Sequence, residues 1–200
     1  KLYRGAEHML YWGCPFKCSY CLVETMRQMY GKDKGRYMRG YSVPRIVEEL
    51  KFLTEKYEIT MWKFFDEEFA SKPLKMWSEL VKLYNDQVRV PFSCMVSACS
   101  LNEQKVDLLA QMRCINVSMG YESGNEDLRT MVLRRKESTD QIVQAAILCK
   151  NAGVRTSSYN MIGLPYESRQ TLFQTVELNK KAGVQDPSVN FWYPLEGTEL

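Results

Sequence analysis

The chain alternates short apolar runs with longer segments in which apolar side chains recur at helical spacing. The apolar runs predict strands over residues 8–13, 59–65, 88–96, 114–119, 154–162 and 188–193. The segments between them predict helices that begin at Ser42, after Pro73, and at Asn102, Ser138 and Ser168. Regular alternation of strands and helices is typical of βαβ units and a parallel sheet.

Two of the predicted helices end in nearly the same way. Lys-Asn-Ala-Gly-Val at 150–154 is matched by Lys-Ala-Gly-Val at 181–184, and Gly153 can adopt the left-handed conformation that closes a helix. This separation fits successive βα units of about 30 residues. Six such units predict an α/β fold, a partial (β/α)6 TIM-like barrel open on one side. In parallel barrels the reactive face lies at the carboxyl ends of the strands.

Length and composition limit the possibilities. Two hundred residues, 45% hydrophobic and 26% charged, suggest one ordinary globular domain. We expect residues 1–200 to be a core domain of a longer chain, because the sequence starts without Met and stops at Thr-Glu-Leu. A net charge of +3 does not argue for nucleic acid, and no apolar run approaches the ~18 residues of a membrane span.

Residues 22–42 predict a long loop, or a short helix with a tail. This segment carries five basic and two acidic side chains (Arg27, Lys32, Lys34, Arg36 and Arg39 against Glu24 and Asp33). A basic stretch is most often a solvated face. Contact with an anionic substrate or a donor protein is the alternative interpretation.

Seven cysteines do not form the pattern of a disulfide-stapled scaffold, because the number is odd and the spacing is wide. Four of them lie in apolar or strand-like surroundings, where buried free thiols are expected: Cys94, Cys99, Cys114 and Cys149. Reduced thiols predict a reducing compartment, and we expect the cytoplasm.

The other three cysteines, Cys14, Cys18 and Cys21, are spaced C-x3-C-x2-C directly after the first predicted strand. Thiolates are soft ligands suited to iron–sulfur clusters, zinc or copper(I). A four-iron cluster normally takes four cysteines, and no fourth follows nearby. Three ligands would leave one iron open, which is the property of a reactive metal site. The alternative is a zinc-stabilised binding module, in which the metal site is structural.

With Tyr20 just before the third cysteine, this stretch resembles the cluster motif of the radical S-adenosylmethionine (SAM) enzymes. The resemblance implies a [4Fe–4S] cluster whose open iron is chelated by SAM. It also implies reductive cleavage of SAM to a 5′-deoxyadenosyl radical. Tyr20 would meet the adenine through its main chain.

The resemblance extends to the ends of the predicted strands. Asp66, Glu67 or Glu68 occupies the place of an acidic motif that holds the SAM amino group, and Ser97, at the end of the next strand, is a further candidate cofactor contact. Glu122, within Gly-Tyr-Glu-Ser-Gly, resembles a stretch of the subgroup often fused to a cobalamin-binding domain. Twelve residues later, Arg134 stands where related enzymes place an arginine beside the SAM carboxylate, although the neighbouring Arg135 is an alternative.

On the fifth predicted strand, Met-Ile-Gly-Leu-Pro-Tyr-Glu at 161–167 resembles a family stretch in which glycine stands in place of Tyr166. The resemblance implies that Ile162 packs against adenine and that Asn160 or Ser158 reaches the ribose or the carboxylate.

The leading hypothesis is therefore a radical SAM enzyme, possibly a cobalamin-assisted methyltransferase or ring-rearranging enzyme. Its substrate would be a small molecule or peptide rather than nucleic acid, and its reductant a flavodoxin- or ferredoxin-type donor. A non-catalytic iron–sulfur electron carrier is the alternative from another class. Such a carrier would need four protein ligands and no binding rim.

Overall fold

A computed structural model describes residues 4–30 and 35–200. Within these residues six parallel strands form one sheet, in the order in which they occur along the chain. The strands are β1 (Gly5–His8), β4 (Met61–Phe64), β5 (Phe92–Val96), β6 (Cys114–Glu122), β7 (Arg155–Ile162) and β8 (Asp186–Phe191). The sheet curves into a half-barrel, which confirms the predicted fold class.

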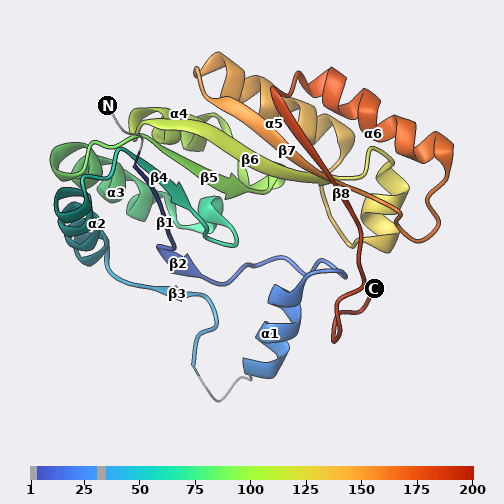
Figure 1. The fold of residues 1–200 in the computed structure, drawn as a ribbon, viewed down its shortest axis with the longest axis horizontal. Coiled ribbons are helices and arrows are strands. Elements are labelled where there is room, and N and C mark those ends of the chain that lie inside the picture. The colour runs from blue at the N-terminus through green and yellow to red at the C-terminus, as the bar shows by residue number, and fades with distance from the viewer. Residues whose placement is uncertain (1–3, 31–34) are drawn as a thin grey trace.

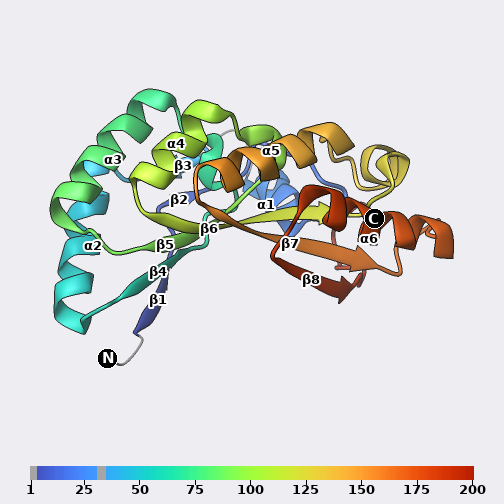
Figure 2. The ribbon, with the colours of Figure 1, turned by 90° about the horizontal axis from the view of Figure 1, so that it is seen from above.

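The helices that connect these strands lie along the outer side of the sheet (Figure 1). They are α2 (Val43–Tyr57), α3 (Leu74–Gln87), α4 (Glu103–Gln111), α5 (Thr139–Asn151) and α6 (Arg169–Ala182). Figure 2 shows α3, α4 and α5 on one face of the strands. A further helix, α1 (Leu22–Tyr30), lies on the opposite side, near the C-terminus (Figure 1).

The core is formed where the sheet meets these helices. Phe64 on β4 stacks on Phe69 with ring centroids 5.6 Å apart, and it packs 5.0 Å from Phe92 on β5. Trp77 of α3 meets Phe69 edge-on at 5.2 Å. Aromatic pairs at such separations add specific geometry to the hydrophobic burial. This cluster joins β4 and β5 to α3.

Local sequence signals at the helix ends are confirmed. Ser138 and Ser168 cap α5 and α6, and each makes a reciprocal capping box with the residue three positions later. Gly153 and Gly183, which follow the two helices, have φ values of 75° and 66°. These are the left-handed conformations predicted from the repeated helix ending.

The first predicted strand, 8–13, is wrong in its position. The sheet strand β1 ends at His8, and the chain then leaves the sheet because the Leu10 amide donates to Asp66 Oδ1 at 2.7 Å instead of to a neighbouring strand. Tyr11–Trp12 forms β2, which pairs antiparallel with β3 (Arg39–Gly40). The prediction over 22–42 is borne out by α1, but residues 31–34, including Lys32 and Lys34, lie outside the described residues.

The other strands differ mainly in length. The third predicted strand, 88–96, begins only at Phe92, since Arg89 is left-handed (φ 59°) and Pro91 has no amide to donate. The fourth, predicted over 114–119, continues to Glu122. Between β6 and α5, a π-helix spans Leu128–Val132. Among the described residues no helix is long and apolar enough to cross a membrane.

Candidate functional site

The three cysteines of the motif lie on one loop between β2 and α1. Cys14, Cys18 and Cys21 are half-buried free thiols, and the Cys21 amide donates to the Cys18 carbonyl at 3.2 Å. Burial raises the pKa of Cys14 to about 12 and that of Cys18 to about 11, and the charge of Cys21 adds to both. The thiols are therefore close enough to influence one another. Binding of a metal must displace their protons.

The acidic triplet after β4 holds this loop in place. Asp66 accepts from the Leu10 amide and from Lys72 Nζ at 2.6 Å, with both side chains buried. Glu67 accepts from the Gly13 amide at 2.7 Å, just ahead of Cys14. Two members of the triplet thus anchor the loop, and the Asp66 carboxylate is already fully partnered.

The third member of the triplet, Glu68, is buried, and its carboxylate reaches the end of the neighbouring strand, β5. Its carboxylate accepts from the backbone amides of Ala70 at 3.1 Å and of Ser97 at 2.7 Å. Burial raises the pKa of Glu68 to about 7, although these amide hydrogen bonds act in the opposite direction. Ser97 is held at the rim of a cavity through its backbone.

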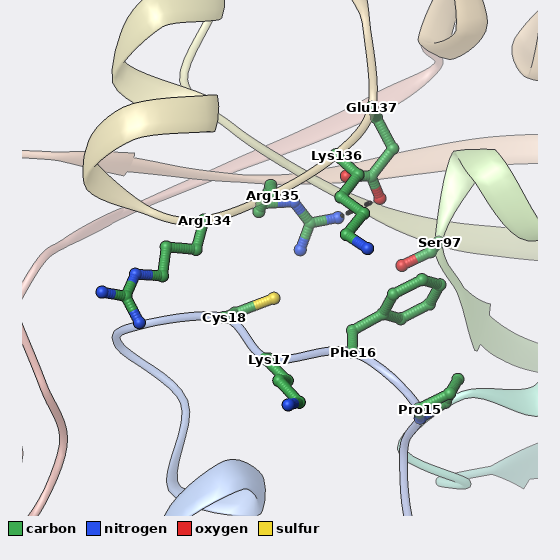
Figure 3. A pocket seen from close by; sticks show the side chains of 9 residues that line it. All are labelled: Pro15, Phe16, Lys17, Cys18, Ser97, Arg134, Arg135, Lys136 and Glu137. Carbon is green, nitrogen blue, oxygen red and sulfur yellow. Dashed lines mark hydrogen bonds and ion pairs between the residues drawn. The ribbon is translucent and has the colours of Figure 1, made fainter.

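Tyr20 and Glu122, both predicted from the sequence, meet in a buried network centred on Arg135. The Tyr20 hydroxyl donates to Glu122 Oε1 at 3.0 Å, and Arg135 Nη1 donates to the Tyr20 oxygen at 3.1 Å. Arg135 Nη2 donates to Glu137 Oε1 and to the Gly120 carbonyl, each at 2.8 Å. Figure 3 shows the Arg135–Glu137 pair beside Cys18.

The charges of this network stabilise one another. Burial raises the pKa of Glu122, while Arg135 and Tyr20 act against that shift. Burial also opposes the charge on Arg135, but Tyr20, Glu122 and Glu137 together raise its pKa well above the usual range. Arg135 is therefore a permanently charged group. Its Nε is buried and has no hydrogen-bond partner among the described residues, so one donor remains unused there.

Arg134, the arginine predicted to face the SAM carboxylate, lies nearer to solvent than its neighbour Arg135. Its side chain is 57% exposed and forms an ion pair with Glu199, whereas the side chain of Arg135 is 8% exposed. The π-helix over Leu128–Val132 lies between Glu122 and these two arginines. Arg134 takes a left-handed conformation with φ 53°.

Two glycines allow the strand end that carries Glu122 to be built. A Cβ on Gly120 would lie 2.2 Å from Glu122 Oε1 and 3.3 Å from Arg135 Nη1. A Cβ on Gly124 would lie 2.0 Å from the Gln174 carbonyl oxygen, in the backbone of α6. The Gly-Tyr-Glu-Ser-Gly stretch thus needs its first glycine for the network and its last for helix packing.

Replacing Gly124 with alanine is expected to lower the free energy of unfolding by about 1–3 kcal/mol, because the α6 backbone must shift to accept the methyl group. Denaturant unfolding followed by circular dichroism measures this loss. Gln174→Ala is the matched control and should change stability by less than about 0.5 kcal/mol, since only an exposed side chain is removed. Equal stabilities of wild type and Gly124→Ala would contradict the packing argument.

The residues predicted on β7 have different surroundings. The Asn160 amide donates to Ser158 Oγ at 2.9 Å, and its oxygen accepts from Asn179 at 2.8 Å, so this side chain is committed to a buried network. Ile162 is half-buried at the end of the strand. Tyr166 is exposed and has φ 64°, the conformation for which glycine is best suited.

Two cavities adjoin Cys18. The first, of about 250 Å³, lies between the loop and the segment after the π-helix, and its lining includes Phe16, Ser97, Arg135 and Glu137 (Figure 3). The second, of about 430 Å³, includes Cys21 and Thr198. Lys17 and Arg134 line both cavities, so the thiol loop is bordered by cationic side chains.

Sequence reasoning missed Glu137 and Arg129. An acid directly before a helix cap is usually explained by the helix dipole, and an arginine at the start of an amphipathic segment by solvent exposure. Both are buried here. No pattern in the sequence distinguishes them from surface charges.

The fold and the thiol loop define the class of protein. The model of the radical SAM superfamily matches residues 10–178, and the chain belongs to this superfamily. Membership confirms the predicted resemblance and implies a [4Fe–4S] cluster and SAM as cofactors.

Several known proteins are similar to the chain. An uncharacterized methyltransferase from Pyrococcus horikoshii is 24% identical over 188 residues, covering 94% of this chain and 39% of that protein. An anaerobic magnesium-protoporphyrin IX monomethyl ester cyclase from Rubrivivax gelatinosus is 24% identical over 172 residues, covering 83% of this chain and 29% of that protein. The chain thus spans well under half the length of these relatives.

Among solved structures, the radical SAM methyltransferase TsrM from Kitasatospora setae, with tryptophan substrate and a SAM analog bound, superposes with a TM-score of 0.78. Its sequence is 17% identical, and the match covers 94% of this chain and 35% of that one. OxsB, a cobalamin-dependent radical SAM enzyme with aqua-cobalamin bound, gives a TM-score of 0.66 at 16% identity, covering 86% of this chain and 26% of that one. These matches establish the fold.

The residues present fit the two cofactors. Three soft donors on one loop can each ligate a different iron of a cluster. Within the described residues no three Cys, His, Asp or Glu side chains are grouped around the position of a single metal ion. Beside the loop, the unpartnered Arg135 Nε is a buried donor that an anionic group can satisfy.

Proposed function

We propose that this chain is the catalytic core of a radical SAM enzyme. Cys14, Cys18 and Cys21 would hold a [4Fe–4S] cluster, and SAM would occupy the fourth iron. A reduced cluster held there would supply one electron for cleavage of the S–C5′ bond of SAM, which would give methionine and a 5′-deoxyadenosyl radical able to take a hydrogen atom from the substrate. The electron would come from a flavodoxin- or ferredoxin-type donor.

One observation carries the proposal: the thiol loop and a charged arginine with an unused donor lie beside the same cavity. Arg135 would bind the SAM carboxylate through its unused Nε donor, in a charge-assisted hydrogen bond. Glu122 would face the ammonium of SAM, with Tyr20 fixing its orientation. Ser97, at the rim of the cavity, stays a proposed cofactor contact.

The other residues predicted to contact SAM differ in how far their side chains are already committed to protein partners. Glu67 anchors the loop and is half-buried, so an oxygen of its carboxylate could also serve the SAM ammonium. Asp66 and Asn160 are committed to buried partners, and their proposed role is to support the site. Ile162 is placed to pack against the adenine.

Cobalamin-assisted methyl transfer or ring formation is the reaction class we propose. Support comes from similarity to a methyltransferase, to a cyclase and to cobalamin-dependent enzymes of the same fold. The substrate would be a small molecule or a peptide. We propose the cytoplasm as the location, since such a cluster needs a reducing compartment.

The test is an anaerobic assay of reconstituted, reduced protein with SAM. We expect about four irons and four sulfides per chain, and formation of 5′-deoxyadenosine with an equal amount of methionine. A protein that takes up iron and is reduced but never forms 5′-deoxyadenosine would favour the electron-carrier alternative. Zinc in place of iron after anaerobic purification would favour the structural module.

A further inference from the structure

Arg129 is a buried arginine at the centre of the segment that supplies Arg135. It belongs to the π-helix and is 0% exposed. Its Nη1 donates to the Ser123 carbonyl at 2.7 Å, its Nη2 to Thr139 Oγ1 at 2.8 Å, and its Nε to the Glu137 carbonyl at 3.3 Å. Burying an ionised side chain is costly unless it is well partnered, so this placement calls for an explanation.

Arg129 contacts the backbone at or beside both carboxylates that flank Arg135. Ser123 directly follows Glu122, and Glu137 is itself the carboxylate that pairs with Arg135. Arg129 therefore holds the backbone of Glu137 and of Ser123, the residue after Glu122, and these two glutamates are the carboxylates that flank Arg135. The Arg129 carbonyl also accepts from the amide of Arg135 at 2.8 Å.

Only an arginine can make this set of contacts. Besides Glu126 Oε2, which lies 3.5 Å from Nη2, three acceptors of Arg129 lie on separate segments, namely the end of β6, the loop after the π-helix and the first residue of α5. A planar guanidinium offers donors in several fixed directions, whereas lysine has a single nitrogen. Lysine at this position could satisfy one or two of the acceptors and would leave the others unpaired.

We propose that Arg129 is a positioning residue that sets the orientation of Arg135 toward the SAM carboxylate. The inference rests on the proposed function, in which Arg135 binds that carboxylate. Arg129 itself lines neither cavity beside Cys18, so it acts through Ser123 and Glu137 rather than by touching SAM.

The experiment compares equilibrium binding of SAM and of decarboxylated SAM, which lacks only the carboxylate, to the cluster-reconstituted chain. Wild type should prefer SAM. Arg129→Lys should weaken binding of SAM on the order of tenfold, the size of a lost charge-assisted hydrogen bond. Binding of decarboxylated SAM should change by less than about twofold, so the preference for SAM over decarboxylated SAM becomes smaller.

Further variants separate positioning from general loosening of the fold. Thr139→Val removes one acceptor of Arg129 without changing the shape of the side chain, and should narrow the preference in the same direction by a smaller factor. Arg129→Lys should add no further loss in an Arg135→Gln background. Arg155→Lys, on an exposed ion pair with Asp186, is the matched control and should bind both ligands as wild type does.

A second readout needs no cofactor. In the metal-free chain, amide hydrogen exchange over residues 134–137 should be faster in Arg129→Lys than in wild type, with exchange in the core strands unchanged. If Arg129→Lys fails to fold, ligand binding and hydrogen exchange are both measured on Thr139→Val instead.

The outcomes distinguish this inference from the proposed function. Equal weakening of both ligands by Arg129→Lys would assign it a purely structural role and overturn the inference alone. A folded Arg129→Lys variant that keeps the wild-type preference for SAM over decarboxylated SAM would also overturn the inference alone. Absence of any preference for SAM in wild type would overturn the carboxylate contact of Arg135, and the inference with it.

Discussion

Replacing Cys18 with alanine is expected to reduce 5′-deoxyadenosine formation to background while leaving the fold intact. Cys18 is the one cysteine of the motif that borders both cavities, so its thiolate would lie where cluster and SAM meet. Its side chain is only half-buried, and its structural hydrogen bond to Cys21 uses the carbonyl. Loss of the thiol should therefore change the free energy of unfolding by less than about 1 kcal/mol.

The measurement combines iron analysis, product analysis and thermal unfolding of the same preparations. Cys149→Ala is the matched control, because this thiol is buried in α5 and has no role in the loop. It should keep its full iron content and its product. Retention of 5′-deoxyadenosine formation in Cys18→Ala, or loss of iron in Cys149→Ala, would contradict the assignment of the ligands.

Replacing Lys72 with methionine is expected to cause the largest loss of stability. Lys72 and Asp66 form an ion pair of 2.6 Å, each side chain only 1% exposed. Removing the cation leaves a buried carboxylate without its counter-charge, which typically costs about 3–5 kcal/mol. For a chain of this size that corresponds to a fall in melting temperature of roughly 6–20 °C.

Two further variants isolate the cause. Asp66→Asn in the Lys72→Met background removes the stranded charge but keeps an acceptor for the Leu10 amide, so it should recover part of the stability. Lys180→Met breaks an ion pair with Glu177 in which both side chains are 68% exposed, and it should cost at most about 1 kcal/mol. Similar losses in Lys72→Met and Lys180→Met would show that burial of the first pair does not matter.

Periodicity and helix ends were enough to predict the half-barrel, because each strand–helix unit carries its own local signals. Ser138 and Gly153, for example, bound α5 through capping and a left-handed turn, which depend on neighbouring residues alone. The position of β1 depended on a distant side chain. Asp66 captures the Leu10 amide across 56 positions of sequence, and no local pattern reveals that contact.

The candidate site shows the same division. Tyr20 and Glu122 could be found because they stand in recognisable motifs, and the structure brings them within 3.0 Å of one another. The choice between the two adjacent arginines could not be made, since it depends on the π-turn that closes from the Leu133 amide to the Leu128 carbonyl at 3.0 Å.

We propose that one iron of the cluster has no protein ligand and is occupied by SAM. Mössbauer spectroscopy of the ⁵⁷Fe-reconstituted chain, recorded with and without SAM, tests it most directly. We expect one of the four irons to change its isomer shift and quadrupole splitting when SAM is added, while the other three keep theirs. Four irons that stay unchanged in the presence of saturating SAM would contradict it.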